Sequence, residues 1–132
     1  MKSFIQEIII NNATPEQAYK ALVNPIEHSN FTGAMAENTD SMDDDFSAYD
    51  GYIIGRNIEL IPKKRIIQTW QAAEDYWPQD HYSEVKYEFT PHPKGTLLKF
   101  SHDNVPDEHA DSIYKGWHEH YWDKLNAYFL RE

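Results

Sequence analysis

The chain contains no cysteine, which excludes a disulfide framework and thiolate chemistry. No apolar run approaches the roughly 20 residues of a membrane-spanning helix, and the N-terminus, MKSFIQEIII, lacks the cleavage pattern of a signal peptide. Lys and Arg number only 12 against 22 Asp and Glu, so the formal net charge is -10. Phosphate binding needs a basic surface. We therefore expect a cytoplasmic protein that binds neither nucleic acid nor a membrane.

Aromatic residues, by contrast, are abundant. The 132 residues include 4 Trp, 9 Tyr and 6 Phe, together 14% of the chain, and 40% of all residues are hydrophobic. No repeat, linker or low-complexity segment divides the sequence. A chain of this length predicts one domain, here residues 1–132, that is large enough to bury a core. We expect that core to be aromatic rather than aliphatic.

The N-terminal part of the sequence predicts a strand followed by two helices. Phe4–Ile10 is rich in β-branched and aromatic residues, which is typical of a strand. Thr14 is placed to cap a helix and Gln17 to close a capping box with it. This helix should end at Asn24, because a proline follows. A second, short helix is predicted over residues 26–30.

The middle of the sequence predicts consecutive short strands joined by tight turns, which form an antiparallel meander. An Asp50-Gly51 pair is typical of a hairpin turn. Between residues 84 and 89, Val85, Tyr87 and Phe89 should be buried, and the alternating Glu84, Lys86 and Glu88 should be exposed. The other predicted strands are Phe46–Tyr49, Tyr52–Ile54, Arg56–Ile61, Arg65–Ala72 and Thr96–Ser101.

A long amphipathic helix is predicted from Asp107 to Phe129 and should lie across the concave side of the sheet. Gly116, in its middle, costs about 1 kcal/mol relative to Ala. That cost predicts close approach of a neighbouring backbone, a bend, or an accepted local defect. At 100° per residue the apolar face contains Ala110, Ile113, Tyr114, Trp117, Tyr121, Leu125 and Tyr128, widened by Trp122 and Phe129, and the polar face contains Ser112, Lys115, Glu119, Asp123 and Asn126.

No spacing in the sequence demands a metal ion or a catalytic group. His118 and His120 would point about 200° apart on a helix, so they do not form a metal site. Asp43-Asp44-Asp45 lacks the spacing of a calcium loop, and no serine lies in a nucleophile elbow. We therefore predict no metal site, no cofactor and no catalytic residue.

One enzymatic alternative stays open at the level of sequence. His102, followed by Asp103, would supply a base at the mouth of a cavity, and Glu84 or Glu88 would supply an acid.

A set of short motifs, in order along the chain, is similar to those of a known family. The set resembles the C-terminal domain of the activator of heat-shock protein 90 ATPase and its stand-alone bacterial relatives, which belong to the START-like, or SRPBCC, superfamily. The resemblance covers roughly Phe4 to Phe129. The motifs are Phe31-Thr32-Gly33, Asp50-Gly51-Tyr52-Ile53-Ile54-Gly55, Leu60-Ile61-Pro62, Ile66-Ile67-Gln68-Thr69-Trp70, Trp77-Pro78, Gly95-Thr96, Val105-Pro106 and Gly116-Trp117 followed by Tyr121-Trp122.

This resemblance implies an α+β helix-grip fold. In that fold a curved antiparallel sheet of about six or seven strands wraps on a long C-terminal helix, and one or two short helices follow the first strand. Two positions depart from the family: Asp44-Asp45 stand where relatives often carry a Gly-Gly pair, and Gln71 stands where many carry Arg. The eukaryotic co-chaperone also has an additional N-terminal domain, whereas this sequence begins at the first strand. Stimulation of a chaperone ATPase therefore does not carry over.

We predict a non-enzymatic module that binds a small hydrophobic or aromatic ligand between the C-terminal helix and the sheet. Such pockets are concave and mostly apolar, with a few polar groups, and one of roughly 300 Å³ or more is expected here. The alternatives are a co-chaperone-type module whose partner is a chaperone or another protein, and a START-like enzyme of the cyclase or hydrolase type. The predicted ligand-binding residues are Trp70, Trp117, Tyr121, Tyr87, Tyr52 and His118.

Overall fold

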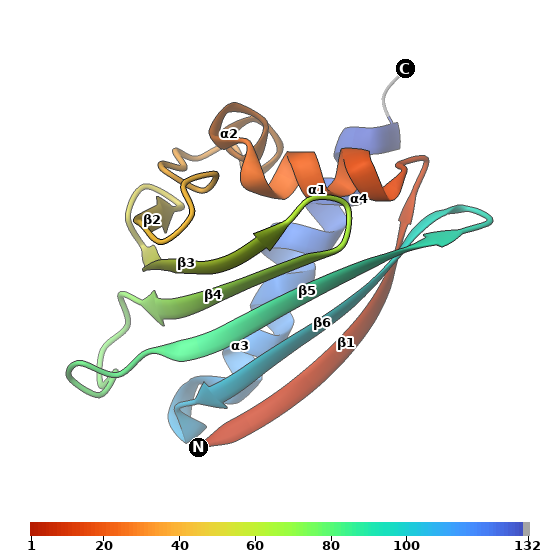
Figure 1. The fold of residues 1–132 in the computed structure, drawn as a ribbon. Coiled ribbons are helices and arrows are strands. Elements are labelled where there is room, and N and C mark those ends of the chain that lie inside the picture. The colour runs from red at the N-terminus through yellow and green to blue at the C-terminus, as the bar shows by residue number, and fades with distance from the viewer. Residues whose placement is uncertain (131–132) are drawn as a thin grey trace.

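Six antiparallel strands form one curved sheet in the order β1-β6-β5-β4-β3-β2, and the C-terminal helical segment lies across its concave face (Figure 1). The computed structural model describes residues 1–130. The predicted α+β class and the predicted path of the long helix are therefore confirmed. The strands are β1 (Lys2–Asn11), β2 (Asp45–Ala48), β3 (Ile53–Ile61), β4 (Arg65–Ala72), β5 (Ser83–His92) and β6 (Gly95–Val105), and the helices are α1 (Pro15–Val23), α2 (Pro25–Thr32), α3 (Ala110–Trp117) and α4 (Asp123–Leu130).

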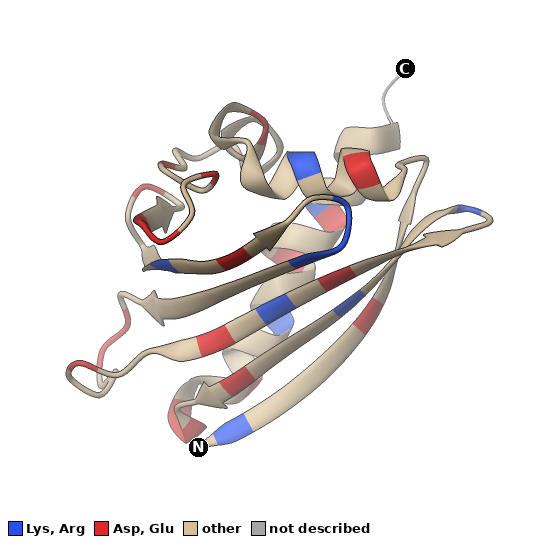
Figure 2. Ribbon diagram, in the orientation of Figure 1, with Lys and Arg blue, Asp and Glu red and all other residues tan. Residues whose placement is uncertain are grey.

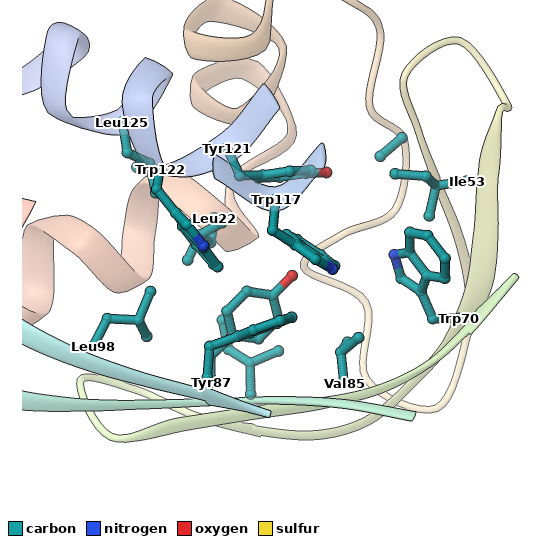
Figure 3. Close-up of a cluster of buried hydrophobic side chains, with 14 of the residues drawn as sticks. Leu22, Ile53, Trp70, Val85, Tyr87, Leu98, Trp117, Tyr121, Trp122 and Leu125 are labelled. Carbon is teal, nitrogen blue, oxygen red and sulfur yellow. The ribbon is translucent and has the colours of Figure 1, made fainter. Parts of the chain in front are cut away.

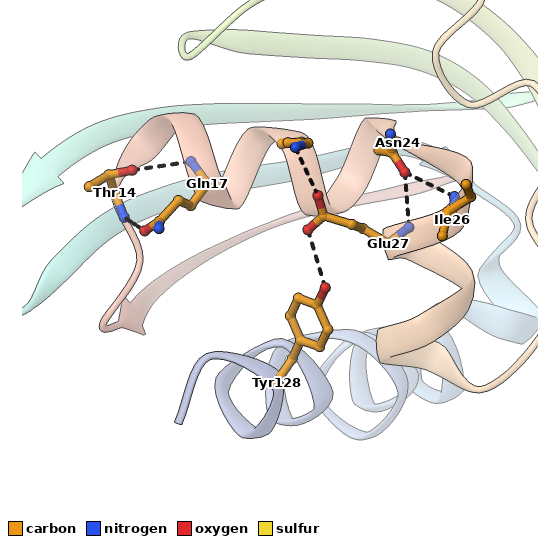
Figure 4. A network of polar contacts seen from close by, with 7 residues as sticks. Thr14, Gln17, Asn24, Ile26, Glu27 and Tyr128 are labelled. Carbon is orange, nitrogen blue, oxygen red and sulfur yellow. Dashed lines mark hydrogen bonds and ion pairs between the residues drawn. The ribbon is translucent and has the colours of Figure 1, made fainter. Parts of the chain in front are cut away.

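Side-chain caps define the two short helices at one end of the sheet (Figure 4). The capping box forms as predicted: Gln17 N–H donates to Thr14 Oγ1 at 3.2 Å, and Thr14 N–H donates to Gln17 Oε1 at 2.9 Å. Asn24 then caps α2 by accepting from the backbone of Ile26 and Glu27, each at 3.0 Å. Because Asn24 supplies this cap, α2 begins at Pro25 and is longer than the predicted 26–30.

The strand bounds differ from the prediction at one glycine. Residues 52–54 and 56–61 were predicted as separate strands, but β3 runs through Gly55 without a break. A Cβ at Gly55 would come within 1.9 Å of the backbone oxygen of Thr69, so only glycine lets β3 and β4 pair this closely here. The hairpin before β3 turns through Tyr49, Asp50 and Gly51, all with positive φ.

The alternating pattern of β5 is confirmed in its register. Val85, Tyr87 and Phe89 are buried, Glu84 is exposed, and Lys86 and Glu88 are half-buried. Charged residues of both signs occur along these strands (Figure 2), and Glu88 forms an ion pair with Arg65 at 3.7 Å. One row crosses four adjacent strands: Glu7 lies opposite Lys99, Lys99 opposite Glu88, and Glu88 opposite Arg65.

The C-terminal segment is not the single α-helix that was predicted. A 3-10 turn (Asp107–His109) precedes α3, and a π-helical turn (His118–Trp122) separates α3 from α4. A π turn places residues five apart on the same side. Trp117 and Trp122 accordingly stack, with ring centroids 5.4 Å apart and planes 18° apart. Both Tyr121 and Trp122 are buried in the core.

Within residues 1–130, no helix has both the length and the apolarity needed to cross a lipid bilayer.

Candidate ligand-binding pocket

A pocket of about 410 Å³ lies where the C-terminal helical segment meets the β2–β3 turn and the end of β4. Its walls come from segments far apart in the sequence, so only the folded chain forms it. The volume lies in the usual range for small-molecule sites. Its lining residues are Tyr49, Tyr52, Ile53, Trp70, Glu74, Ser112, Ile113, Gly116, Trp117, Glu119, His120 and Tyr121.

Four of these residues form a continuous series of rings, which we call the aromatic arc: Tyr49, Tyr121, Trp117 and Trp70. Successive ring centroids are 5.7 Å, 4.7 Å and 5.8 Å apart. In Figure 3, Tyr121 and Trp117 enter from the helical segment, and Trp70 and Ile53 face them from the sheet. The arc therefore presents a largely apolar wall to whatever occupies the pocket.

Gly116 and the π turn shape the helical side of the pocket. An added Cβ at Gly116 would meet only His120 Cδ2, at 3.8 Å. The predicted close backbone approach at Gly116 is thus wrong, and its missing side chain leaves open space at the pocket wall. Two residues later the π turn begins, and its His120 carbonyl accepts from the Tyr49 hydroxyl at 2.5 Å. Burial raises the pKa of Tyr49 to about 12, so this hydroxyl stays protonated and can donate.

Two carboxylates belong to the lining. Glu74 accepts a hydrogen bond from the hydroxyl of Tyr52. Burial, and then this hydrogen bond and the charge of Glu74, raise the pKa of Tyr52 above its ordinary value. Glu119 is exposed and forms no ion pair with any residue in the described part of the chain. No lysine or arginine lines the pocket.

A directed chain of hydrogen bonds lies beside the aromatic arc. Trp117 Nε1–H donates to His102 Nδ1 at 3.1 Å, so this nitrogen carries no proton. The proton of the neutral ring is then on Nε2, which donates to Ser83 Oγ at 2.8 Å, and Ser83 donates onward to the carbonyl of Trp70 at 2.9 Å. Burial lowers the pKa of His102 to about 3.

This chain corrects the suggestion that His102 is a base at a cavity mouth. His102 has no exposed surface, and Ser83 is also buried. A nucleophilic serine must give its proton to the imidazole, whereas here the imidazole donates to the serine. The proposed acids do not reach the pocket either. Glu84 and Glu88 lie on the outer face of the sheet and outside the pocket lining.

A second buried histidine fixes the far side of Tyr121. His28 Nδ1 lies 2.9 Å from the carbonyl of Leu22 and therefore carries the proton, and His28 Nε2 accepts from the Tyr121 hydroxyl at 2.9 Å. Burial lowers the pKa of His28 to about 4 and raises that of Tyr121. Tyr121 is thus held by its hydroxyl and offers its ring to the pocket.

The structure brings four of the six sequence-predicted ligand-binding residues into the pocket lining: Trp70, Trp117, Tyr121 and Tyr52. Tyr87 is buried under Trp117, at 6.2 Å between ring centroids, and does not line the pocket. His118 is also outside the lining and contacts the Tyr114 ring at 5.7 Å.

Several lining residues had no signal in the sequence, among them Tyr49, Glu74 and His120. Tyr49 was predicted as the last residue of a strand, and Glu74 lies in the irregular segment after β4. Gly116 did carry a signal, since a glycine inside a helix needs a reason. Within residues 1–130, no group of three or more His, Asp or Glu side chains is arranged to hold a metal ion.

The curved sheet, the long helical segment that it grips and the pocket between them define a START-like helix-grip protein. The chain belongs to the family described as "Activator of Hsp90 ATPase homolog 1-like protein", which it matches over residues 12–130. The resemblance noted from the sequence motifs is therefore confirmed.

Curated relatives include two activators of the 90 kDa heat shock protein ATPase. Homolog 1 of Homo sapiens is 23% identical over 116 residues, which cover 88% of this chain and 34% of the relative. Homolog 2 of Mus musculus is 28% identical over 82 residues, which cover 62% of this chain and 24% of the relative. The chain thus spans about a quarter to a third of the length of these relatives.

Solved structures agree on the fold. An HSP90 activator from Plasmodium falciparum superposes with a TM-score of 0.79 at 22% identity, covering 96% of this chain and 93% of that one. Protein CV1439 from Chromobacterium violaceum superposes with a TM-score of 0.78 at 21% identity, covering 98% of each chain. At these identities the likeness concerns the fold alone.

Proposed function

We propose that this protein binds a small hydrophobic or aromatic molecule in the pocket and does not transform it. The observation that carries the proposal is the aromatic arc lining a cavity of about 410 Å³. A pocket of this size takes a guest of two or three fused rings. The large side chains of the arc line this space without filling it.

The polar groups of the lining support binding rather than chemistry. Ser112 donates its hydroxyl to the carbonyl of His109 at 3.1 Å, so it faces no base. The Tyr49 and Tyr121 hydroxyls are used by His120 and His28. The Tyr52 hydroxyl does pair with the Glu74 carboxylate, but its pKa is raised, so it stays protonated, which is the opposite of what activates a nucleophile.

The proposal can be tested with N-phenyl-1-naphthylamine, a neutral fluorescent probe. We expect saturable binding of one probe per chain, with quenching of tryptophan emission. The Gly116→Trp variant should fill the pocket and weaken binding at least about tenfold, because it adds an indole where a Cβ meets no crowding. Gly116→Ala, which adds one methyl group, is the matched control and should bind nearly as wild type. Saturable binding that Gly116→Trp leaves unchanged would contradict the pocket assignment, and no binding would contradict the function.

A second candidate is a chaperone partner, which the named activity of the relatives favours. The acidic charge of -10 would favour a basic surface on that partner. The test is the ATP hydrolysis rate of a purified 90 kDa heat shock protein with and without this chain, at low and high salt. Stimulation that persists in Gly116→Trp would separate this function from pocket binding. A cytoplasmic location, expected from the sequence, suits either candidate.

A further inference from the structure

Trp70 carries a hydrogen-bond donor that the protein leaves unused. The other three tryptophans donate to His81 O, His102 Nδ1 and Gln6 Oε1, respectively. Trp70 Nε1–H has no acceptor within residues 1–130, although only 5% of this residue is exposed. Buried indole N–H groups normally find an acceptor. This one therefore calls for an explanation.

The unused donor reaches the pocket. In the described part of the chain, the one fully enclosed side-chain nitrogen or oxygen that lacks a hydrogen-bond partner is His109 Nε2. Trp70 Nε1 lacks a partner as well, but it is not one of the fully enclosed atoms. It therefore keeps some accessible surface. The open space beside Trp70 is the pocket, and Figure 3 shows the indole nitrogen on the side of the ring that faces Trp117 and Tyr121. A bound molecule with an acceptor oxygen or nitrogen would complete this hydrogen bond.

The charges of the lining residues also favour cationic over anionic ligands. Glu74 and Glu119 are both exposed, and the lining holds no Lys or Arg. A carboxylate ligand would therefore meet two negative charges with no fixed cation to pair with, in a chain whose net charge is -10. A cationic ligand would instead be attracted by the two carboxylates, and also by the ring faces of Tyr and Trp, which attract positive charge. Aromatic walls joined to carboxylates are a familiar arrangement for alkylated ammonium groups.

We propose that the pocket selects a flat organic cation, a substituted ammonium on an aromatic body, that places a hydrogen-bond acceptor against Trp70 Nε1. This inference rests on the proposed function and narrows its ligand class. Fatty acids and other anions, which the same apolar walls would otherwise admit, are disfavoured. Trp70 sets the orientation of the ligand, and Glu74 and Glu119 set the sign of its charge.

Three acetylnaphthalenes that differ in one substituent test the charge preference. The substituent is trimethylammoniomethyl, the neutral isostere neopentyl, or carboxymethyl. We expect the ammonium probe to bind about tenfold more tightly than the neopentyl probe, and the carboxymethyl probe to bind most weakly. Glu74→Gln and Glu119→Gln should each reduce the ratio of ammonium to neopentyl affinity, whereas Glu16→Gln, an exposed carboxylate outside the pocket lining, should leave it unchanged.

A fourth probe tests the acceptor. It is the ammonium compound with its carbonyl replaced by a methylene group. Wild-type protein should bind the ketone about tenfold more tightly than this analogue, and Trp70→Phe, which keeps an aromatic ring but removes the N–H, should bind both alike. Because the readout is a ratio within each protein, a general loss of affinity in the variant does not affect it.

The outcomes separate this inference from the proposed function. Equal affinities for the ammonium and neopentyl probes, or tighter binding of the carboxymethyl probe, overturn the inference and leave a pocket for neutral ligands. Failure of the ammonium probe to bind also overturns the inference. If N-phenyl-1-naphthylamine fails to bind as well, the proposed function falls with it.

Discussion

Trp117 and His102 are joined by a hydrogen bond of 3.1 Å from the indole nitrogen to Nδ1, and this contact ties the helical segment to β6 inside the core. It also requires the imidazole to stay neutral, because a protonated Nδ1 could not accept. Burial works in the same direction by lowering the pKa of His102 to about 3. The folded state therefore excludes a proton that the unfolded chain takes up near the ordinary histidine pKa of 6.5.

The pH dependence of stability follows from this difference. Below pH 6.5 the unfolded state binds the proton and the folded state does not, so the free energy of unfolding falls as pH drops from 6.5 toward 3. His28, whose pKa is lowered to about 4, adds a similar loss of unfolding free energy as pH drops from 6.5 to 4. Each histidine contributes a slope of up to about 1.4 kcal/mol per pH unit.

Urea denaturation at pH 7, 6 and 5 measures this effect. In His102→Gln, whose amide stays neutral, the fall in unfolding free energy between pH 7 and 5 should be smaller than in wild type. The exposed His120→Gln is the control and should follow the wild-type profile. If wild type and His102→Gln lost stability in parallel, His102 would not be the group responsible.

We predict that substitution of glycine by alanine has opposite effects on stability at Gly116 and at Gly55. Gly116→Ala should raise the free energy of unfolding by up to about 1 kcal/mol, because glycine is unfavourable in a helix and the added methyl meets nothing closer than 3.8 Å. Gly55→Ala should lower it strongly, since its Cβ would overlap the backbone oxygen of Thr69. Thermal and urea unfolding of both variants check this pair. A destabilised Gly116→Ala would show that the space at the pocket wall is not free.

Much of the fold could be predicted because local sequence patterns determine its helices and strands. The Thr14–Gln17 capping box involves residues three apart, and the alternation from Glu84 to Phe89 follows from the period of a strand. The π turn could not be predicted from local sequence patterns. Its contacts are not local: it accepts a hydrogen bond from Tyr49, 71 residues away in sequence, and its Trp122 stacks on Trp117 only in the folded helix.

The candidate site was predicted in part for the same reason. Trp70, Trp117 and Tyr121 were marked as ligand-binding residues by their size and by the helical period. Whether Tyr87 lines the pocket or the core depends on which side of Trp117 it lies, and only the three-dimensional packing decides that.

Trp117 should be the most costly residue to remove from the core. It is 2% exposed and packs on Phe100 and Tyr121 at centroid distances of 4.4 and 4.7 Å. Trp117→Ala should lower the free energy of unfolding by about 3–5 kcal/mol, from lost burial and the cavity left behind. Tyr76→Ala, at a residue that is 84% exposed, should change it by less than about 0.5 kcal/mol. A loss below about 1 kcal/mol for Trp117→Ala would mean that this ring serves the pocket and not the core.

Asn57 should govern the order of the loop that precedes β2. Its buried amide donates to the carbonyls of Asn38 and Ser41, each at 2.8 Å, and accepts from Gln68 at 3.0 Å. Asn57→Leu leaves these groups without partners, at about 1–3 kcal/mol for each buried one. We expect a loss of at least about 3 kcal/mol and faster proteolysis between residues 34 and 44. Asn30→Ala, on the exposed side of α2, should have neither effect, and an intact, protease-resistant loop in Asn57→Leu would contradict the assignment.

The hydroxyl of Tyr49 should stabilise the π turn from across the pocket. The carbonyl of His120, inside the π turn, accepts a hydrogen bond from the Tyr49 hydroxyl at 2.5 Å. Tyr49→Phe removes this donor alone, so the unfolding free energy should fall by about 1 kcal/mol. Amide hydrogen exchange should also become faster at residues 118–124. Tyr19→Phe is the control, because the Tyr19 hydroxyl donates no hydrogen bond within the described residues and its ring packs on Phe89 in the same way as a phenylalanine would. Unchanged exchange at the turn in Tyr49→Phe would show that the stacking of Trp117 on Trp122 suffices to hold it, and the hydroxyl would then act on the pocket wall only.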